Sequence, residues 1–159
     1  MWFFMNTCYV FSLISFVMLL VAFFQSFLKF YVFAANHLTF MILTSIIYLF
    51  TETLVIFFFV GTGVSIKEYA QAHHLDAQFQ KKSFAVKMKI YPPLLLNMLF
   101  LIILFILVGA VDTGHIASWI YQFYFAFCIW HFLYSKRIQN DCFRTNTENI
   151  LAMSGVAGK

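Results

Sequence analysis

The chain has 159 residues, of which 63% are hydrophobic and 10% are charged, and its formal net charge is +4. Soluble domains average about 45–50% apolar and about 25% charged residues, so this composition excludes an ordinary water-soluble fold and predicts an all-α integral membrane protein. The basic residues stand beside apolar runs. That placement favours phospholipid headgroups at a basic inner face as partners and argues against nucleic acid.

The first apolar run covers residues 8–28 and contains no charge before Lys29. It has about the 20 residues that a helix needs to cross roughly 30 Å of hydrocarbon. The start of the chain lacks a positive segment and a small-residue cleavage site. We therefore expect this run to be a retained span and not a signal peptide.

The second run covers residues 38–64 and carries one carboxylate, Glu52, near its middle. A charged carboxylate at this depth costs several kcal/mol unless it is paired, solvated or protonated. Ser45 and Tyr48 precede it at helical spacing and extend a polar stripe. Two interpretations stay open. One is a proton relay, an ion site or a hydrogen-bond partner for a quinone or pigment. The other is a paired or neutral Glu that sets helix packing or contacts a partner subunit.

Residues 65–91 form a basic segment between the second and third runs. Its apolar residues are only weakly periodic over 66–80, so a short helix on the membrane surface and a solvated connector are both open. The third run, 92–111, starts at Pro92-Pro93, which predicts a helix beginning there. It is nearly all aliphatic apart from Asn97, which suggests a helix that faces lipid or a partner subunit.

The fourth run covers residues 116–134 and follows turn-forming residues at 112–114, which predict a tight antiparallel hairpin with the third. One face of its predicted helix carries Tyr121, Tyr124, Cys128, His131 and Ser135 at steps of three and four.

Counting inward from the outer ends places His131 near the depth of Glu52, and Tyr48 near that of Tyr124. A hydrogen bond between Glu52 and His131 is therefore one hypothesis. Axial ligation of a haem or another tetrapyrrole by His131 is a second, and a histidine satisfied at the interface is the third.

Three residues of the expected outer turns are weak candidates for a zinc, copper or iron site: His37, Asp112 and His115. Their spacing matches no metal signature. The alternative is that Asp112 caps its turn and that the two histidines lie at the membrane interface.

Charge asymmetry sets the expected topology, because segments on the cytoplasmic side of a membrane carry the excess of Lys and Arg. It predicts a four-helix transmembrane domain over residues 1–135 and a tail over 136–159. Both termini and the basic loop then face the cytoplasm, in a bacterial inner membrane. Apart from Lys29, the basic residues are Lys67, Lys81, Lys82, Lys87, Lys89, Lys136, Arg137, Arg144 and Lys159.

No nucleotide fingerprint, metalloprotease motif or plausible nucleophile and base stands in the sequence. We therefore expect a non-catalytic integral membrane subunit of a larger complex, which packs against partner subunits, binds lipids and borders a cofactor or lipid. Two alternatives stay open. One is an electron-transport subunit that contacts quinone or haem through Glu52 and His131. The other is a small proton or ion transporter that depends on Glu52.

Overall fold

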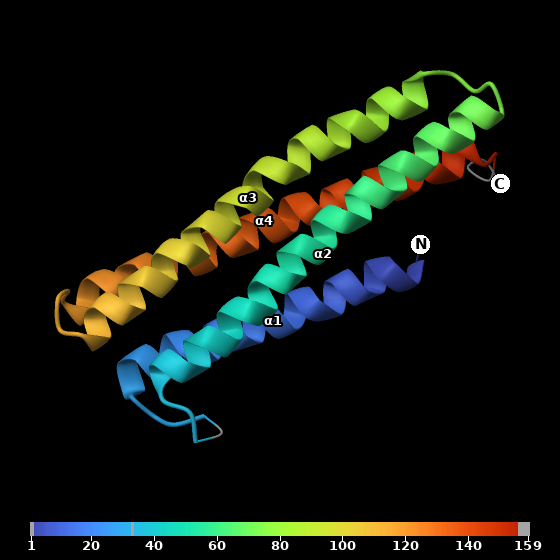
Figure 1. The fold of residues 1–159 in the computed structure, drawn as a ribbon. Helices are drawn as coiled ribbons and strands as arrows, with labels where there is room; N and C mark the ends of the chain where they lie inside the picture. Colours follow the sequence, from blue (N-terminus) through green and yellow to red (C-terminus); the bar gives the residue numbers. More distant parts are fainter. Residues whose placement is uncertain (1, 33, 156–159) are drawn as a thin grey trace.

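The protein forms four long helices in a computed structural model that describes residues 2–32 and 34–155 (Figure 1). In chain order they are α1 (Trp2–Leu28), α2 (His37–Ala72), α3 (Gln78–Asp112) and α4 (Ser118–Met153). Helix α1 packs against α2 and α4, and α3 packs against the same two helices from the opposite side. The result is an up-and-down bundle, as predicted for an all-α protein. The basic residue Lys159 and the last residues of the expected tail lie outside the described residues.

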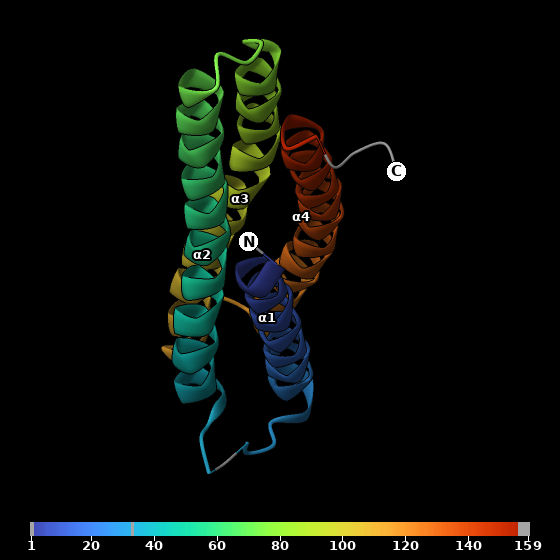
Figure 2. The ribbon, with the colours of Figure 1, turned by 90° about the vertical axis from the view of Figure 1, so that its right-hand side faces the viewer.

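The bundle has two distinct ends. The connections 29–36 and 113–117 lie together at one, which we call the two-loop end, and the turn 73–77 lies at the other, which we call the basic end (Figure 1). Helix α1 is shorter than its neighbours. Helices α2, α3 and α4 therefore continue past its N-terminus toward the basic end (Figure 2).

Among the described residues, three helices, α1, α2 and α3, are long and apolar enough to cross a membrane. Large hydrophobic side chains also cover their outer surfaces, including Leu13 at 64% exposure, Phe57 at 65% and Ile106 at 63%. Apolar surface of this extent requires a lipid or protein environment. The structure thus supports membrane residence.

Much of the expected loop 65–91 is helical. Helix α2 runs to Ala72 and α3 begins at Gln78, so the prediction of a helix start at Pro92-Pro93 was wrong. Residues 66–80, left open as a surface helix or a solvated connector, are instead the ends of α2 and α3 with a turn between them. Both prolines lie inside α3. Proline removes one backbone hydrogen bond and frees the carbonyl four residues earlier, here those of Met88 and Lys89. Long helices tolerate this where neighbouring groups or water satisfy the freed carbonyl.

The segment expected as a tail is also part of the bundle, because α4 continues unbroken to Met153. Its residues Cys142 and Phe143 are each 1% exposed and pack with residues of α1, α2 and α3. At roughly 1.5 Å per residue, the part of α4 after Tyr134 extends for about 28 Å.

Candidate functional site

A buried layer of polar side chains divides the hydrophobic core into two parts. On the side of the two-loop end lies a cluster that includes Leu19, Tyr48 and Phe125, and on the side of the basic end lies one that includes Val55 and Phe143. Between the two clusters, the members of the polar layer are Ser12, Ser15, Thr51, Glu52, Asn97, His131, Ser135, Lys136 and Gln139. All of these residues are buried except Lys136, whose side chain is 15% exposed.

Glu52 lies at the centre of the polar layer, with none of its surface exposed. Its Oε1 accepts from the ammonium of Lys136 at 3.0 Å and from the side-chain amide of Asn97 at 3.2 Å. The carboxylate of α2 is thus held by groups from both α3 and α4. Its Oε2 has no hydrogen-bond partner within the described part of the chain.

Lys136 reaches Glu52 because of the direction in which helical side chains lean. Side chains on an α-helix tilt toward its N-terminus, so Lys136 leans from the basic half of α4 back toward the bundle centre. Its ammonium lies 4.8 Å from the centre of the Phe132 ring and also donates to Gln139 Oε1 at 2.8 Å. The apolar stem is buried while the charged end meets its partners.

Asn97 joins Glu52 to His131. Its Nδ2 donates to Glu52, and its Oδ1 lies 2.6 Å from His131 Nδ1. At roughly 1.5 Å per residue, Glu52 and Asn97 lie about 22 Å from the two-loop ends of their helices and His131 about 20 Å, so the depths agree. The predicted direct Glu52–His131 bond was wrong, because the amide stands between the two groups. Asn97 is 2% exposed and faces the bundle interior, whereas α3 exposes apolar residues such as Ile106 on its outer surface.

Helix α1 joins the polar layer through hydroxyl groups. Ser15 Oγ and Thr51 Oγ1 lie 2.8 Å apart, and both residues are fully buried. Nearer the basic end, the Tyr9 hydroxyl donates to Asn140 Oδ1 at 2.6 Å. Interhelical hydrogen bonds of this kind contribute about 0.6–2 kcal/mol each in a membrane.

The other residues of the predicted stripes do not converge on Glu52. Tyr48 packs its ring against Phe132 at 5.3 Å, whereas the hydroxyl of Tyr124 donates to the carbonyl oxygen of Phe100 at 3.3 Å. Tyr48 and Tyr124, which the sequence placed at similar depths, therefore make two separate contacts. The Cys128 thiol makes a weak bond to the same carbonyl, at 3.8 Å.

Ser45 is 9% exposed and lines an apolar groove between α2 and α3, about two turns away from Glu52 along the same helix. The cavity beside the polar layer is lined by residues that include Tyr48, Asn97 and Cys128, and its volume is about 10 Å³. That is room for about one water molecule. A quinone or haem therefore does not fit beside these residues in the packing that the structure shows.

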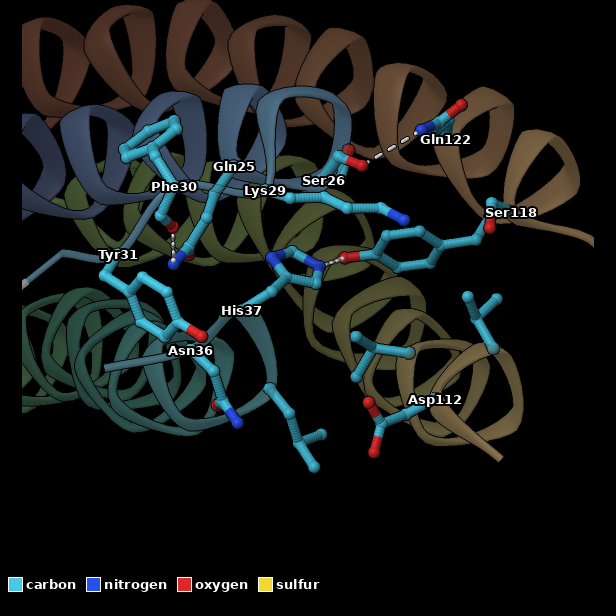
Figure 3. A pocket seen from close by; sticks show the side chains of 14 residues that line it. Gln25, Ser26, Lys29, Phe30, Tyr31, Asn36, His37, Asp112, Ser118 and Gln122 are labelled. Atoms are coloured by element: carbon cyan, nitrogen blue, oxygen red, sulfur yellow. Dashed lines mark hydrogen bonds between the residues drawn. The ribbon is translucent and has the colours of Figure 1, made fainter. Parts of the chain in front are cut away.

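At the two-loop end, the three weak metal candidates do not form a ligand set. His37 Nε2 lies 2.8 Å from the Tyr121 hydroxyl, and His115 Nδ1 lies 2.9 Å from the Thr113 hydroxyl. The described residues contain no group of three or more His, Cys, Asp or Glu placed to hold a metal ion. His37 and Asp112 do line one pocket there (Figure 3).

Two members of the polar layer, Gln139 and Asn97, carry a signal in the sequence for a buried contact. Gln139 follows Ser135 by four positions, and so continues the polar face that runs through His131. Asn97 is the main polar residue of an aliphatic run, and an isolated amide there favours a buried contact. The sequence relates Lys136 only to the charge asymmetry, because its contact with Glu52 depends on how α2 and α4 pack.

No protein-family model, curated protein or solved structure matches this chain.

Proposed function

We propose that this protein is a non-catalytic integral membrane subunit that packs against other membrane subunits and stabilises them. The observation that carries the proposal is that the buried ionisable groups are paired with one another within the bundle. Glu52 and Lys136 neutralise each other at 3.0 Å, and Asn97 connects them to His131. These groups contact one another between helices of one bundle, as charges within membrane segments do when they pair.

The core argues against the transporter alternative. A transport path needs polar or ionisable groups along its length. Between the polar layer and the two-loop end, the buried residues are mainly hydrophobic, among them Leu19, Leu104 and Phe125. The redox alternative has no supporting contact among the described residues. The outer surfaces of α1, α2 and α3 are strongly apolar, as a subunit that meets lipid and partner helices requires.

Association with partners is tested by photo-crosslinking in the native membrane, followed by purification in a mild detergent. A photoreactive residue replaces Phe57, Ile106 or Phe123, which are 65%, 63% and 79% exposed and lie on α2, α3 and α4. We expect a discrete crosslink to another membrane protein from at least one position, and stoichiometric co-purification of that protein. The same substitution at Phe125, which is fully buried, serves as the control. A protein that purifies alone or only with copies of itself contradicts the proposal.

The proposal includes a topology of four spans, in which the N-terminal half of α4, rich in aromatic residues, is the fourth span. The two-loop end is then external, and both termini and the basic end are cytoplasmic. Eight of the nine basic residues assigned to that side lie within the described residues, on the basic halves of α2, α3 and α4. Positive segments resist translocation, which supports this orientation.

Cysteine labelling in intact cells tests the topology. The native thiols are buried, and burial raises the pKa of Cys142, so all three should react slowly with a membrane-impermeant maleimide. His115→Cys, at the two-loop end, should be labelled in intact cells. Gln71→Cys, at the basic end, should be labelled only after permeabilisation. Both native residues are exposed. The reverse pattern would contradict the orientation, and labelling of both in intact cells would contradict the span count.

A further inference from the structure

The two-loop end contains a pocket of about 360 Å³, built from the ends of all four helices and from residues 29–31 and 36 between α1 and α2 (Figure 3). This volume lies in the range of about 300–1,000 Å³ that is common for small-molecule sites. Leu38, Val108 and Val111 form an apolar part of the wall. Its polar lining includes Gln25, Lys29, His37, Asp112 and Ser118.

Two polar atoms at the pocket are buried without partners among the described residues. Gln25 is 1% exposed, and its Nε2 donates to the carbonyl oxygens of Phe30 at 2.8 Å and Ala35 at 3.2 Å. Its Oε1 has no partner, and neither has Nδ1 of His37. A buried polar atom without a partner costs about 1–3 kcal/mol. An amide oxygen can only accept, so Gln25 favours a ligand that carries a hydrogen-bond donor.

The pocket also presents opposite charges on its two sides. Lys29 and Asp112 lie on either side of the hydrogen bond between His37 and Tyr121 (Figure 3), and neither belongs to the salt bridges formed within the described residues. The first turn of α4 contributes Ser118 to the lining, and its N-cap residue makes no side-chain capping bond. Free N–H groups at a helix N-terminus attract anions.

Lys29 occupies a position that its backbone does not favour. Its φ is 50°, in the left-handed region just after α1, where glycine is the preferred residue. It is also the one basic residue that lies away from the two basic segments of the sequence.

We propose that this pocket binds a zwitterionic headgroup of the phosphoethanolamine type. The phosphate meets Lys29 and the first turn of α4, and the ammonium meets the carboxylate of Asp112 across the pocket. A phospholipid at this end of a membrane-spanning bundle would present such a headgroup, and a soluble phosphoethanolamine ester has the same chemistry. The inference does not depend on the protein's being a subunit of a complex.

Native mass spectrometry of the delipidated full-length protein tests the proposal. Dioleoylphosphatidylethanolamine should bind about tenfold more tightly than dioleoylphosphatidylglycerol, whose headgroup lacks the ammonium. Lys29→Gly and Asp112→Asn should each weaken phosphatidylethanolamine binding about tenfold, whereas Lys29→Arg should retain it. Glycine suits the backbone at position 29, so Lys29→Gly should leave the melting temperature unchanged or higher. Lys67→Ala, at the basic end, is the control for general loss of positive charge.

Competition with soluble O-phosphoethanolamine distinguishes the two sources of the headgroup. Displacement of bound lipid supports recognition of the headgroup alone and admits a soluble ligand. Resistance to displacement supports recognition of the whole membrane lipid. Equal binding of the two phospholipids, or binding that neither Lys29→Gly nor Asp112→Asn weakens, would overturn the proposal.

Discussion

Lys136→Met is expected to lower the free energy of unfolding by about 3–5 kcal/mol, because it leaves a buried carboxylate without its cation. Glu52 has no exposed surface, and Lys136 is its partner at 3.0 Å. After the substitution, one neutral hydrogen bond from Asn97 at 3.2 Å remains on that carboxylate. Unfolding in a titration of denaturing detergent measures the effect.

A double-mutant cycle separates the pair from its surroundings. Glu52→Gln alone removes the charge and keeps an oxygen for Asn97, so it should cost less, about 1–3 kcal/mol. The double variant Glu52→Gln/Lys136→Met carries no unpaired charge and should be more stable than Lys136→Met alone. Independent, additive effects of the two substitutions would contradict the ion pair.

The exposed pair on the same helix is a matched control. Arg144 Nε lies 2.9 Å from Glu148 Oε1, but the two side chains are 81% and 62% exposed. Solvent screens such a pair, so Arg144→Ala should leave the free energy of unfolding nearly unchanged. The comparison shows how far burial, and not distance, determines the contribution of an ion pair.

Phe143→Ala is expected to destabilise the protein by about 3–5 kcal/mol, because it empties a buried aromatic site. Phe143 is 1% exposed. Its ring centre lies 4.9 Å from that of Phe58, 5.2 Å from that of Phe59 and 5.2 Å from that of Tyr9. The ring therefore joins the segment of α4 that the sequence suggested was a tail to both α1 and α2. Thermal unfolding, followed by exposure of the buried cysteines to a thiol-reactive dye, measures the loss.

Phe84 on α3 is the control for Phe143, since it is also an aromatic residue in the basic half of the bundle but is 64% exposed. Phe84→Ala should change stability by about 0.5 kcal/mol or less. Similar costs for the two substitutions would contradict the packing of the terminal part of α4.

Helical class and the approximate positions of the apolar segments followed from local composition. A run such as 8–28 is helical in a membrane because lipid offers no partner to its backbone N–H and C=O groups, whatever its neighbours are. The turn after Asp112 was predicted for a similarly local reason, the preference of Asp, Thr and Gly for turns. The ends of α2 and α3 were not predicted. Pro92 and Pro93 are a local signal for a helix start, and packing of residues such as Val86 and Ile90 in the core extends α3 past them.

The polar layer shows the same division between local and tertiary information. The sequence by itself identified Glu52 as a carboxylate that needs a partner, and helical spacing placed His131 at nearly the same depth. Only the packing of α3 between α2 and α4 decided that Asn97 separates the two and that Lys136 supplies the charge. The depth of a residue in the membrane depends on its position along one helix, and the sequence contains that information. Contact depends on the order and rotation of the helices, which many side chains determine together.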